Sequence, residues 1–267
     1  MVFNPFDSSL AFVWDLIAAV ISIVILLALV QINGIMQKKG VLSQIITRKF
    51  VHIFAGPIFV LTWMLFSGEI VSHYIASIVP LLFILQFVAI GTGFMKNESF
   101  VNSMSRSGNP KELLGGTLYY AIVMLLMTFF WFYVPSTGID NANPTALLII
   151  GCVSGGDGLA DIIGRKFGRE KKFGIKGSEK TIIGSIGMLV GSILVSSILV
   201  MIFSLEVPNF NIVVLILPII VVSVVATVVE ALSPKGTDNF LIFIAVIITI
   251  LILELGFPDF WPFSYSF

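Results

Sequence analysis

Charged residues are scarce in this chain, and cysteine is almost absent. Only 11 % of the 267 residues are charged whereas 57 % are hydrophobic, and the mean hydropathy is +1.06. This balance excludes an ordinary water-soluble domain. The single cysteine, Cys152, excludes a disulfide framework and a zinc site built from cysteines. No basic residue precedes Lys38, so the positively charged start of a cleavable signal peptide is missing.

Long apolar runs fill most of the chain. A helix needs about 20 apolar residues to cross the hydrocarbon core. Eight runs approach or reach this length, at residues 16–32, 50–66, 70–93, 113–134, 145–163, 181–203, 212–230 and 240–255. Their length and lack of alternation indicate helices rather than strands. We therefore expect one all-α membrane domain over residues 1–267, a bundle of about eight transmembrane helices with no detachable soluble part.

The fifteen Lys and Arg residues all lie on one side of this arrangement. They follow the first, third, fifth and seventh runs, whereas the other loops carry acids such as Glu69 and Asp259. Because basic loops stay in the cytoplasm, the basic side is expected to be cytoplasmic and both termini to lie on the other side. A cytoplasmic polar site would then be built from residues 33–49, 94–112, 164–180 and 230–239. The protein would sit in a plasma, inner or organelle membrane.

The most polar stretch, residues 155–185, contains two aspartates four residues apart. Asp157 and Asp161 would share one face of a helix at the cytoplasmic end of the fifth run. Two neighbouring carboxylates need a cation, and Mg²⁺ is usually held by one or two carboxylates together with phosphate oxygens. We expect these aspartates to bind Mg²⁺ and to be catalytic. An ion pair between Asp161 and Arg165 is the simpler alternative.

Cations and glycines surround these aspartates in the sequence. Glycines let backbone amides approach phosphate, and a helix start adds free amides, although glycines also allow close helix packing and basic loops also contact anionic lipid. The expected nucleotide- or phosphate-binding residues in this stretch are Gly156, Gly158, Gly164, Arg165, Lys166, Lys180 and Thr181.

Basic residues also open the second run. Arg48 and His52 would lie one turn apart on a helix face, with Lys49 beside them. A phosphate contact and a simple anchor at the membrane boundary both fit this pattern. Arg106, in the loop before the fourth run, is a weaker candidate.

A last polar cluster joins the seventh and eighth runs. Glu230 ends a helix, where the helix dipole disfavours an acid, so we expect it to have a cationic or metal partner. Asp238 and Asn239 begin the next helix, where Asp238 would also serve as an N-cap. Glu230 and Asp238 are both candidate catalytic residues.

Taken in order, these motifs resemble the CTP-dependent lipid-alcohol kinases, which include the dolichol, phytol and farnesol kinases and the CTP-dependent diacylglycerol kinase. The resemblance covers about residues 45–245. It rests on R-K-x-x-H from Arg48, the glycine- and aspartate-rich stretch 156–168, K-T-x-x-G-S from Lys180, Glu230 with Asp238-Asn239, and a weaker match at residues 106–116.

The resemblance implies transfer of the γ-phosphate of CTP to the hydroxyl of a membrane lipid alcohol, with Mg²⁺. By position, the family's important residues correspond to Arg48, Lys49, Asp157 and Gly164. Asp157 and Asp161 would hold the metal, and Glu230 or Asp238 would orient or deprotonate the hydroxyl. The expected partners are the lipid alcohol, the nucleotide and the bilayer, with no nucleic acid. The cations that would hold the triphosphate are Arg48, Lys49, Arg165, Lys166 and Lys180, with possible contributions from His52, Arg106 and Asn239.

Two other functions stay open. A phosphatidate cytidylyltransferase is also a multi-span enzyme that uses CTP, but its expected S-P-x-K-T stretch is replaced here by Gly177-Ser178-Glu179-Lys180-Thr181. An ion-coupled transporter would carry its acids near the membrane midplane. Here the charges gather on one side of the membrane, which favours the kinase.

Overall fold

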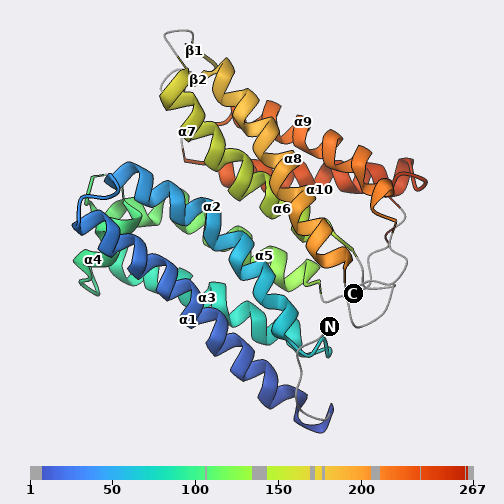
Figure 1. The fold of residues 1–267 in the computed structure, drawn as a ribbon, viewed down its shortest axis with the longest axis horizontal. Helices are drawn as coiled ribbons and strands as arrows, with labels where there is room; N and C mark the ends of the chain where they lie inside the picture. Colours follow the sequence, from blue (N-terminus) through green and yellow to red (C-terminus); the bar gives the residue numbers. More distant parts are fainter. Residues whose placement is uncertain are drawn as a thin grey trace.

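The computed structural model describes residues 8–105, 107–133, 143–168, 172–175, 178–205, 211–234, 236–261 and 263. Helices make up most of this part of the chain (Figure 1). The α-helices are α1 (Ala11–Lys38), α2 (Gln44–Thr62), α3 (Ser72–Gly91), α4 (Glu98–Met104), α5 (Gly116–Trp131), α6 (Thr145–Ile150), α7 (Asp157–Phe167), α8 (Ile182–Ser204), α9 (Ile216–Ala231) and α10 (Asp238–Gly256).

Shorter elements connect or extend these helices. Four are 3₁₀ turns: η1 (Ser8–Leu10), η2 (Trp63–Leu65), η3 (Pro110–Leu114) and η7 (Ile212–Leu215). A π-helical segment, η6 (Gly151–Gly156), joins α6 to α7 without a break. The strands β1 (Lys172–Phe173) and β2 (Lys180–Thr181) form a small antiparallel hairpin in which Lys172 pairs with Thr181.

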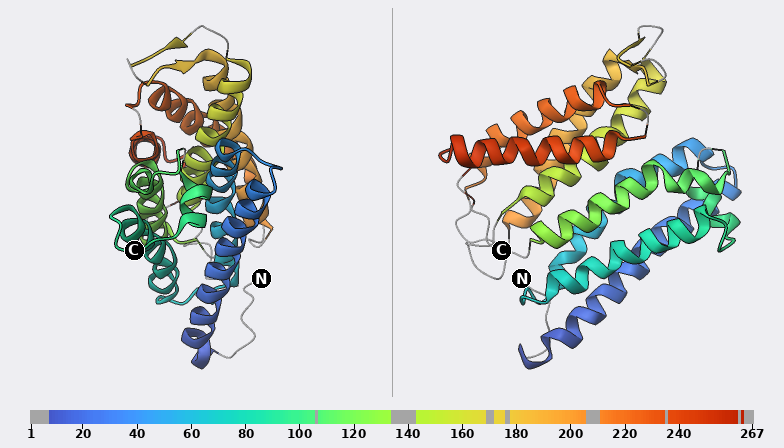
Figure 2. Two further views of the ribbon diagram at one scale, coloured as in Figure 1. Left: turned by 90° about the vertical axis from the view of Figure 1, so that its left-hand side faces the viewer. Right: turned by 180° about the vertical axis from the view of Figure 1, so that it is seen from behind.

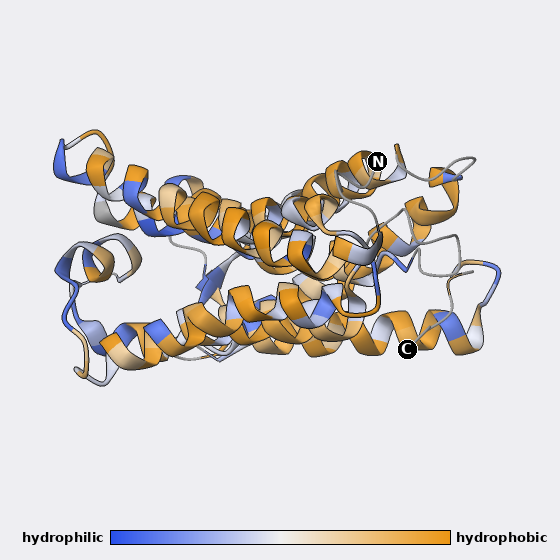
Figure 3. Ribbon diagram, turned by 90° about the horizontal axis from the view of Figure 1, so that it is seen from below, coloured by the Kyte–Doolittle hydropathy of each residue, from blue (hydrophilic) through white to orange (hydrophobic). Residues whose placement is uncertain are grey.

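Eight helical stretches of the described chain are long and apolar enough to cross a membrane. They confirm the predicted all-α polytopic bundle, although several extend beyond the predicted runs. The first covers Ala11–Lys38, and the fifth joins α6, η6 and α7 as Thr145–Phe167. Figure 3 shows hydrophobic residues along the middle of the helices and hydrophilic residues towards the ends.

The helices form two groups that are splayed apart at one side (Figures 1 and 2). In the first group α3 packs against α1 and α5, and α1 also packs against α2 and α4. In the second group α8 packs against α7, η6 and α9, and α9 packs against α10. The groups meet where α2 contacts η6 and α7, and where α5 contacts α10.

The fifth span is the centre of the bundle. All the side chains of α6 and η6 are buried, whereas the other spans each expose one face to the surroundings. Glycines bring this span close to α8, because a Cβ at Gly151 or Gly155 would overlap Ser196 or Val195. The fifth span is therefore a buried central helix, and its buried part extends into the first turn of α7, which starts at Asp157.

The predicted basic side corresponds to one end of the bundle. The hairpin, α4 and the starts of α2 and α10 lie at this end, and the beginning of α1 lies at the opposite end (Figure 1). Which end faces the cytoplasm stays a prediction from the charge distribution.

Candidate active site

Two cavities open between the helix groups and share part of their lining. The first, of about 440 Å³, is enclosed by α1, α2, α3 and α5 and is called here the apolar cavity. The second, of about 480 Å³, lies between α7, the hairpin and the ends of α9 and α10, and is called the polar cavity. Four residues line both: Lys49, Asp157, Gly236 and Asp238. They mark the junction between the two cavities.

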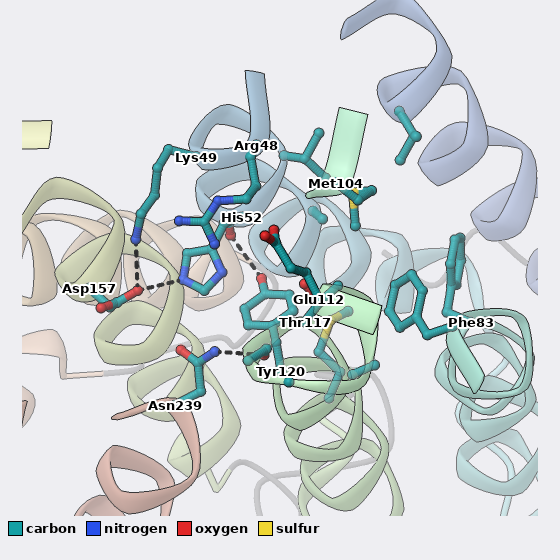
Figure 4. Close-up of a pocket in the computed structure, with 18 of the residues that line it drawn as sticks. Arg48, Lys49, His52, Phe83, Met104, Glu112, Thr117, Tyr120, Asp157 and Asn239 are labelled. Carbon is teal, nitrogen blue, oxygen red and sulfur yellow. Dashed lines mark hydrogen bonds and ion pairs between the residues drawn. The ribbon is translucent and has the colours of Figure 1, made fainter. Parts of the chain in front are cut away.

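Asp157 is held at this junction by two side chains of α2 (Figure 4). Its Oδ2 lies 3.2 Å from the ammonium of Lys49 and 3.0 Å from Nε2 of His52. Lys49 and His52 are three residues apart, so they share one face of α2. Lys49 is only 5 % exposed and Asp157 only 6 % exposed. A buried ion pair therefore connects the two helix groups.

The hydrogen-bond partners of His52 also fix its tautomer. Nε2 lies 3.0 Å from the carbonyl oxygen of Val153 and 3.0 Å from the carboxylate of Asp157. Both neighbours are acceptors, so Nε2 carries a hydrogen and donates. Tyr120 then donates to the carbonyl of His52 and is hydrogen-bonded to Ser154. His52 is therefore an orienting donor for Asp157, held in place through its own backbone.

Asp161 lies one turn after Asp157 on α7, on the same face as the sequence predicts. Its Oδ1 accepts a hydrogen bond of 2.8 Å from Nε of Arg165, and its Oδ2 lies 3.6 Å from Lys49 and 4.0 Å from Arg48. Lys49 thus lies between the two aspartates. The predicted grouping of Arg48, Lys49, Asp157 and Asp161 is present, although 108 residues separate Lys49 from Asp157.

A second ion-pair cluster closes the far side of the polar cavity. Lys180, in β2, donates to Glu230 and lies 3.7 Å from Asp238. Burial acts to lower the pKa of Lys180, but Glu230, Asp157 and Asp238 together outweigh it and hold that pKa above its ordinary value. The ammonium therefore stays charged at neutral pH. Glu230 has the cationic partner that its position at a helix end predicts.

The apolar cavity was not predicted from the sequence. Its apolar lining comes from five separate helices, α1 to α5, and includes Leu26, Val30, Pro80, Phe83, Phe87 and Met124. Near the junction it is also lined by Glu112, Thr117, Tyr120 and Asn239. Asn239 donates to the carbonyl of Gly116 and so ties α10 to α5. Of these four residues, Asn239 was a predicted candidate and Glu112 belongs to the weak motif at residues 106–116, whereas Thr117 and Tyr120 were not predicted.

Comparison of the sequence with known proteins shows which proteins this chain is similar to. The chain is 38% identical over 183 residues to "Probable phytol kinase 2, chloroplastic" of Oryza sativa, covering 68% of this chain and 57% of the relative. It is 36% identical over 210 residues to "Farnesol kinase, chloroplastic" of Arabidopsis thaliana, covering 77% and 63%. It is 35% identical over 215 residues to "Phytol kinase 1, chloroplastic" of Arabidopsis thaliana, covering 79% and 67%.

The chain belongs to the phytol and farnesol kinase family. It spans between about half and two thirds of the length of these curated relatives. No family model matches the sequence, and no solved structure matches the fold. The family relationship agrees with the order of motifs from Arg48 to Asn239.

The acids of this family member fit a magnesium ion shared with phosphate. Within the described ranges there is no group of three or more His, Cys, Asp or Glu side chains that could enclose a metal by themselves. Two carboxylates lie one turn apart, and the buried Oδ2 of Asp161 accepts no hydrogen bond from the described residues. Magnesium commonly takes one or two carboxylates and completes its shell with phosphate oxygens and water. Asp157 and Asp161 match this donor set.

Two of the predicted phosphate-binding glycines have another role. Gly156 faces Ser192 and Met188 of α8, and Gly158 faces Ile53 of α2; a Cβ at either position would overlap these side chains. Neither glycine lines the polar cavity. The structure therefore gives both glycines a role in close helix packing, and a contact with phosphate stays a prediction.

Lys166 lies outside the lining of both cavities, and its phosphate contact also stays a prediction. It follows Arg165 by one residue and so points about 100° away around the helix. Its ammonium lies 5.2 Å from the centre of the Phe167 ring and lines neither cavity.

The other predicted residues of the central stretch stay close to the polar cavity. Gly164, Arg165, Lys180 and Thr181 all line it. Thr181 caps α8 by accepting from the amide of Gly184, and Gly164 lies against Thr181 and Gly184. The remaining candidate, Arg106, lies outside the described residues.

Proposed function

We propose that this protein transfers the terminal phosphate of CTP to the hydroxyl group of an isoprenoid alcohol of the phytol or farnesol class, with Mg²⁺. The observation that supports this most directly is the junction of two unlike cavities at Lys49, Asp157 and Asp238. A water-soluble triphosphate and a membrane-soluble alcohol require such a pair of compartments. The names of the relatives support the alcohol class.

The polar cavity would receive the triphosphate. Phosphoryl transfer depends mainly on positioning and on neutralising the charge of the phosphates. Lys49, Arg165 and Lys180 line the cavity as cations, and Arg48, which lines the apolar cavity, lies 4.0 Å from the carboxylate of Asp161. Mg²⁺, held by Asp157 and Asp161, would supply further positive charge at the transferred group. His52 keeps the Asp157 carboxylate in one orientation by donating to it.

The apolar cavity would receive the alcohol, with its hydroxyl at the junction and its hydrocarbon chain among Phe83, Phe87 and Met124. Because the alcohol already lies in hydrocarbon, van der Waals packing against these side chains, rather than removal from water, would favour this binding. The nucleotide would enter from the basic end of the bundle, which the positive-inside rule assigns to the cytoplasm.

CTP as the donor rests on the resemblance alone, so the test includes the donor. The purified protein in mixed micelles would receive Mg²⁺ and CTP labelled on the γ-phosphate or on the base, with ATP, GTP and UTP as competitors. Farnesol, phytol, geranylgeraniol, a polyprenol, diacylglycerol and phosphatidate would be supplied in turn, with Asp157→Asn as the inactive control.

The position of the label decides between the functions. Label from the γ-phosphate in an isoprenoid alcohol supports the proposal and names the substrate. Base label entering phosphatidate would instead identify a cytidylyltransferase. Absence of transfer to every lipid would refute both lipid reactions and favour transport.

A further inference from the structure

We propose that Glu112 is the residue that orients the alcohol hydroxyl and accepts its proton. This inference rests on the proposed function and adds a catalytic residue to it. Glu112 belongs to η3, immediately before α5, and its side chain lines the apolar cavity but not the polar one. It is thus an acid on the lipid side of the junction.

The local structure holds the Glu112 carboxylate in place. Ser107 donates a hydrogen bond of 2.6 Å to Oε1 of Glu112 across the loop that precedes η3. Asn109 caps η3 through the amide of Lys111. Figure 4 shows the carboxylate reaching into the cavity near Thr117 and His52. The residues that continue the wall from this point are Thr117, Tyr120, Ala121 and Met124 of α5.

Three carboxylates line the apolar cavity within the described part of the chain: Glu112, Asp157 and Asp238. Asp157 is paired with Lys49 and oriented by His52, which suits a metal ligand. Asp238 also lines the polar cavity and lies 3.7 Å from Lys180. Both therefore belong to the charged network on the phosphate side. Glu112 is the one of the three that lines only the lipid side.

The direction of the reaction favours an acid in this position. In phosphoryl transfer the attacking and leaving oxygens lie roughly in line with the phosphorus. A nucleotide in the polar cavity sends its leaving group back into that cavity, so the alcohol must attack from the opposite side. The proton acceptor for the alcohol then belongs on the apolar side, where Glu112 lies.

Two other side chains, His52 and Tyr120, lie between Asp157 and Glu112 in the view of Figure 4. The hydroxyl of Tyr120 donates to the His52 carbonyl. Nε2 of His52 donates to Val153 and Asp157, which leaves Nδ1 as the one ring nitrogen that could accept a proton. Because His52 is held against Asp157, on the phosphate side of the junction, Glu112 remains the proton acceptor on the lipid side.

The step balances as follows. A bond forms between the alcohol oxygen and the γ-phosphorus, and the bond from that phosphorus to the oxygen bridging it to the β-phosphorus breaks. CDP leaves with the electron pair of the broken bond. The hydroxyl proton passes to the carboxylate of Glu112 and from there to water, which regenerates the carboxylate.

The test compares Glu112→Gln, Glu112→Asp and Asp238→Asn with the wild-type protein in the labelled-CTP assay. We expect Glu112→Gln to lower kcat by about 100-fold or more, since general base catalysis typically contributes that much. The KM values for CTP and alcohol should stay near those of the wild type, because the loss falls on the transition state. Glu112→Asp should recover part of the rate. The acid limb of the kcat–pH profile should disappear in Glu112→Gln.

A second pair of variants separates catalysis from structure. Glu112→Ala leaves space beside the hydroxyl, so added formate should restore part of the activity if a carboxylate is what the reaction lacks. Ser107→Ala keeps the acid but removes the hydrogen bond that fixes it, and should lower kcat less than Glu112→Gln does. These variants also decide the matter if Glu112→Gln does not fold.

The outcomes distinguish this inference from the proposed function. An active wild-type protein with an equally active Glu112→Gln variant would overturn the role of Glu112 alone. If Asp238→Asn loses kcat while Glu112→Gln keeps it, the role passes to Asp238. A wild-type protein that transfers no phosphate would remove the proposed function and this assignment with it.

Discussion

Two buried aspartates lie at opposite ends of the bundle and differ in their partners. Asp15 of α1 is fully buried; its carboxylate accepts hydrogen bonds from the amide and hydroxyl of Ser67, at 2.7 and 2.9 Å, and from the hydroxyl of Ser72 at 2.6 Å. Asp157 is buried to a similar degree but is paired with the cation Lys49 and with His52. Asp15 has only neutral donors among its hydrogen-bond partners, whereas Asp157 is paired with a cation.

The difference shows what burial of an acid does and does not indicate. The donors of Asp15 lie in the connection between α2 and α3 and at the start of α3, so the carboxylate joins α1 to this region. Lys49 is attracted to Asp157 and Asp161 alike and would be equally attracted to a phosphate. A buried acid therefore indicates a site for a charged ligand only where its partner is a cation that could bind the ligand as well.

The same substitution at the two acids should separate their roles most strongly. Asp157→Asn is expected to lower kcat for lipid phosphorylation by about 1,000-fold, because it removes charge that would hold the metal and phosphates. Asp15→Asn should keep a near-normal kcat but lose about 1–3 kcal/mol of stability, because a buried donor loses its acceptor. Product formation and thermal unfolding in micelles measure the two effects. A folded but inactive Asp15→Asn variant would break the comparison.

Removing Lys49, the cation paired with Asp157, tests the same ion pair through its other partner. Lys49→Met leaves Asp157 buried without its ion pair, which typically lowers stability by about 3–5 kcal/mol. Activity should also fall strongly, because Lys49 lines both cavities. The variant is to be compared with wild type for labelled-CTP binding and for unfolding temperature. Unchanged CTP binding would argue against a phosphate contact by Lys49.

Removing one neutral donor should have a smaller effect and no catalytic one. Ser72→Ala deletes a single hydrogen bond to Asp15, so we expect a loss of about 1 kcal/mol in stability. The kinase activity of the remaining folded protein should match that of wild type. A change in KM for either substrate would contradict this prediction, because it would show that the hydrogen bonds of Asp15 affect substrate binding at the other end of the bundle.

The smallest contrast lies between adjacent residues of α7. Arg165 is half exposed and pairs with Asp161, so Arg165→Ala should change stability by no more than about 0.5 kcal/mol. It should still raise the KM for CTP, because the side chain lines the polar cavity. Lys166→Ala is the matched control and should leave that KM unchanged, as Lys166 lines neither cavity. Equal increases in the KM for CTP from both substitutions would show that CTP binding depends on the net charge of this region and not on a contact with Arg165.

The sequence predicts the transmembrane helices well because bilayer thickness imposes a local rule on each of them. It also predicts that Asp157 and Asp161 share a face, since a spacing of four residues is one helical turn. The need of Glu230 for a cation follows from its place at a helix end. In each of these cases the information lies within one element.

Contacts between elements could not be obtained in this way. Nothing in the spacing of Lys49 and Asp157 indicates that they meet, and no run of residues encodes the apolar cavity, to which five helices contribute apolar side chains. The packing contacts of Gly156 and Gly158 could not be obtained from the sequence for the same reason. A glycine that admits a phosphate and one that admits a neighbouring helix look alike in the sequence.

The π-helical segment before Asp157 sets the face on which the two aspartates lie. A π turn holds one more residue than an α turn. If residues 151–156 wound as an ordinary α-helix with none of them lost, Asp157 and Asp161 would turn together by about 100° around the axis and leave the face of Lys49. During divergence from a common ancestor, this segment would therefore accept exchanges among small residues but reject changes that straighten the π turn into an α-helix.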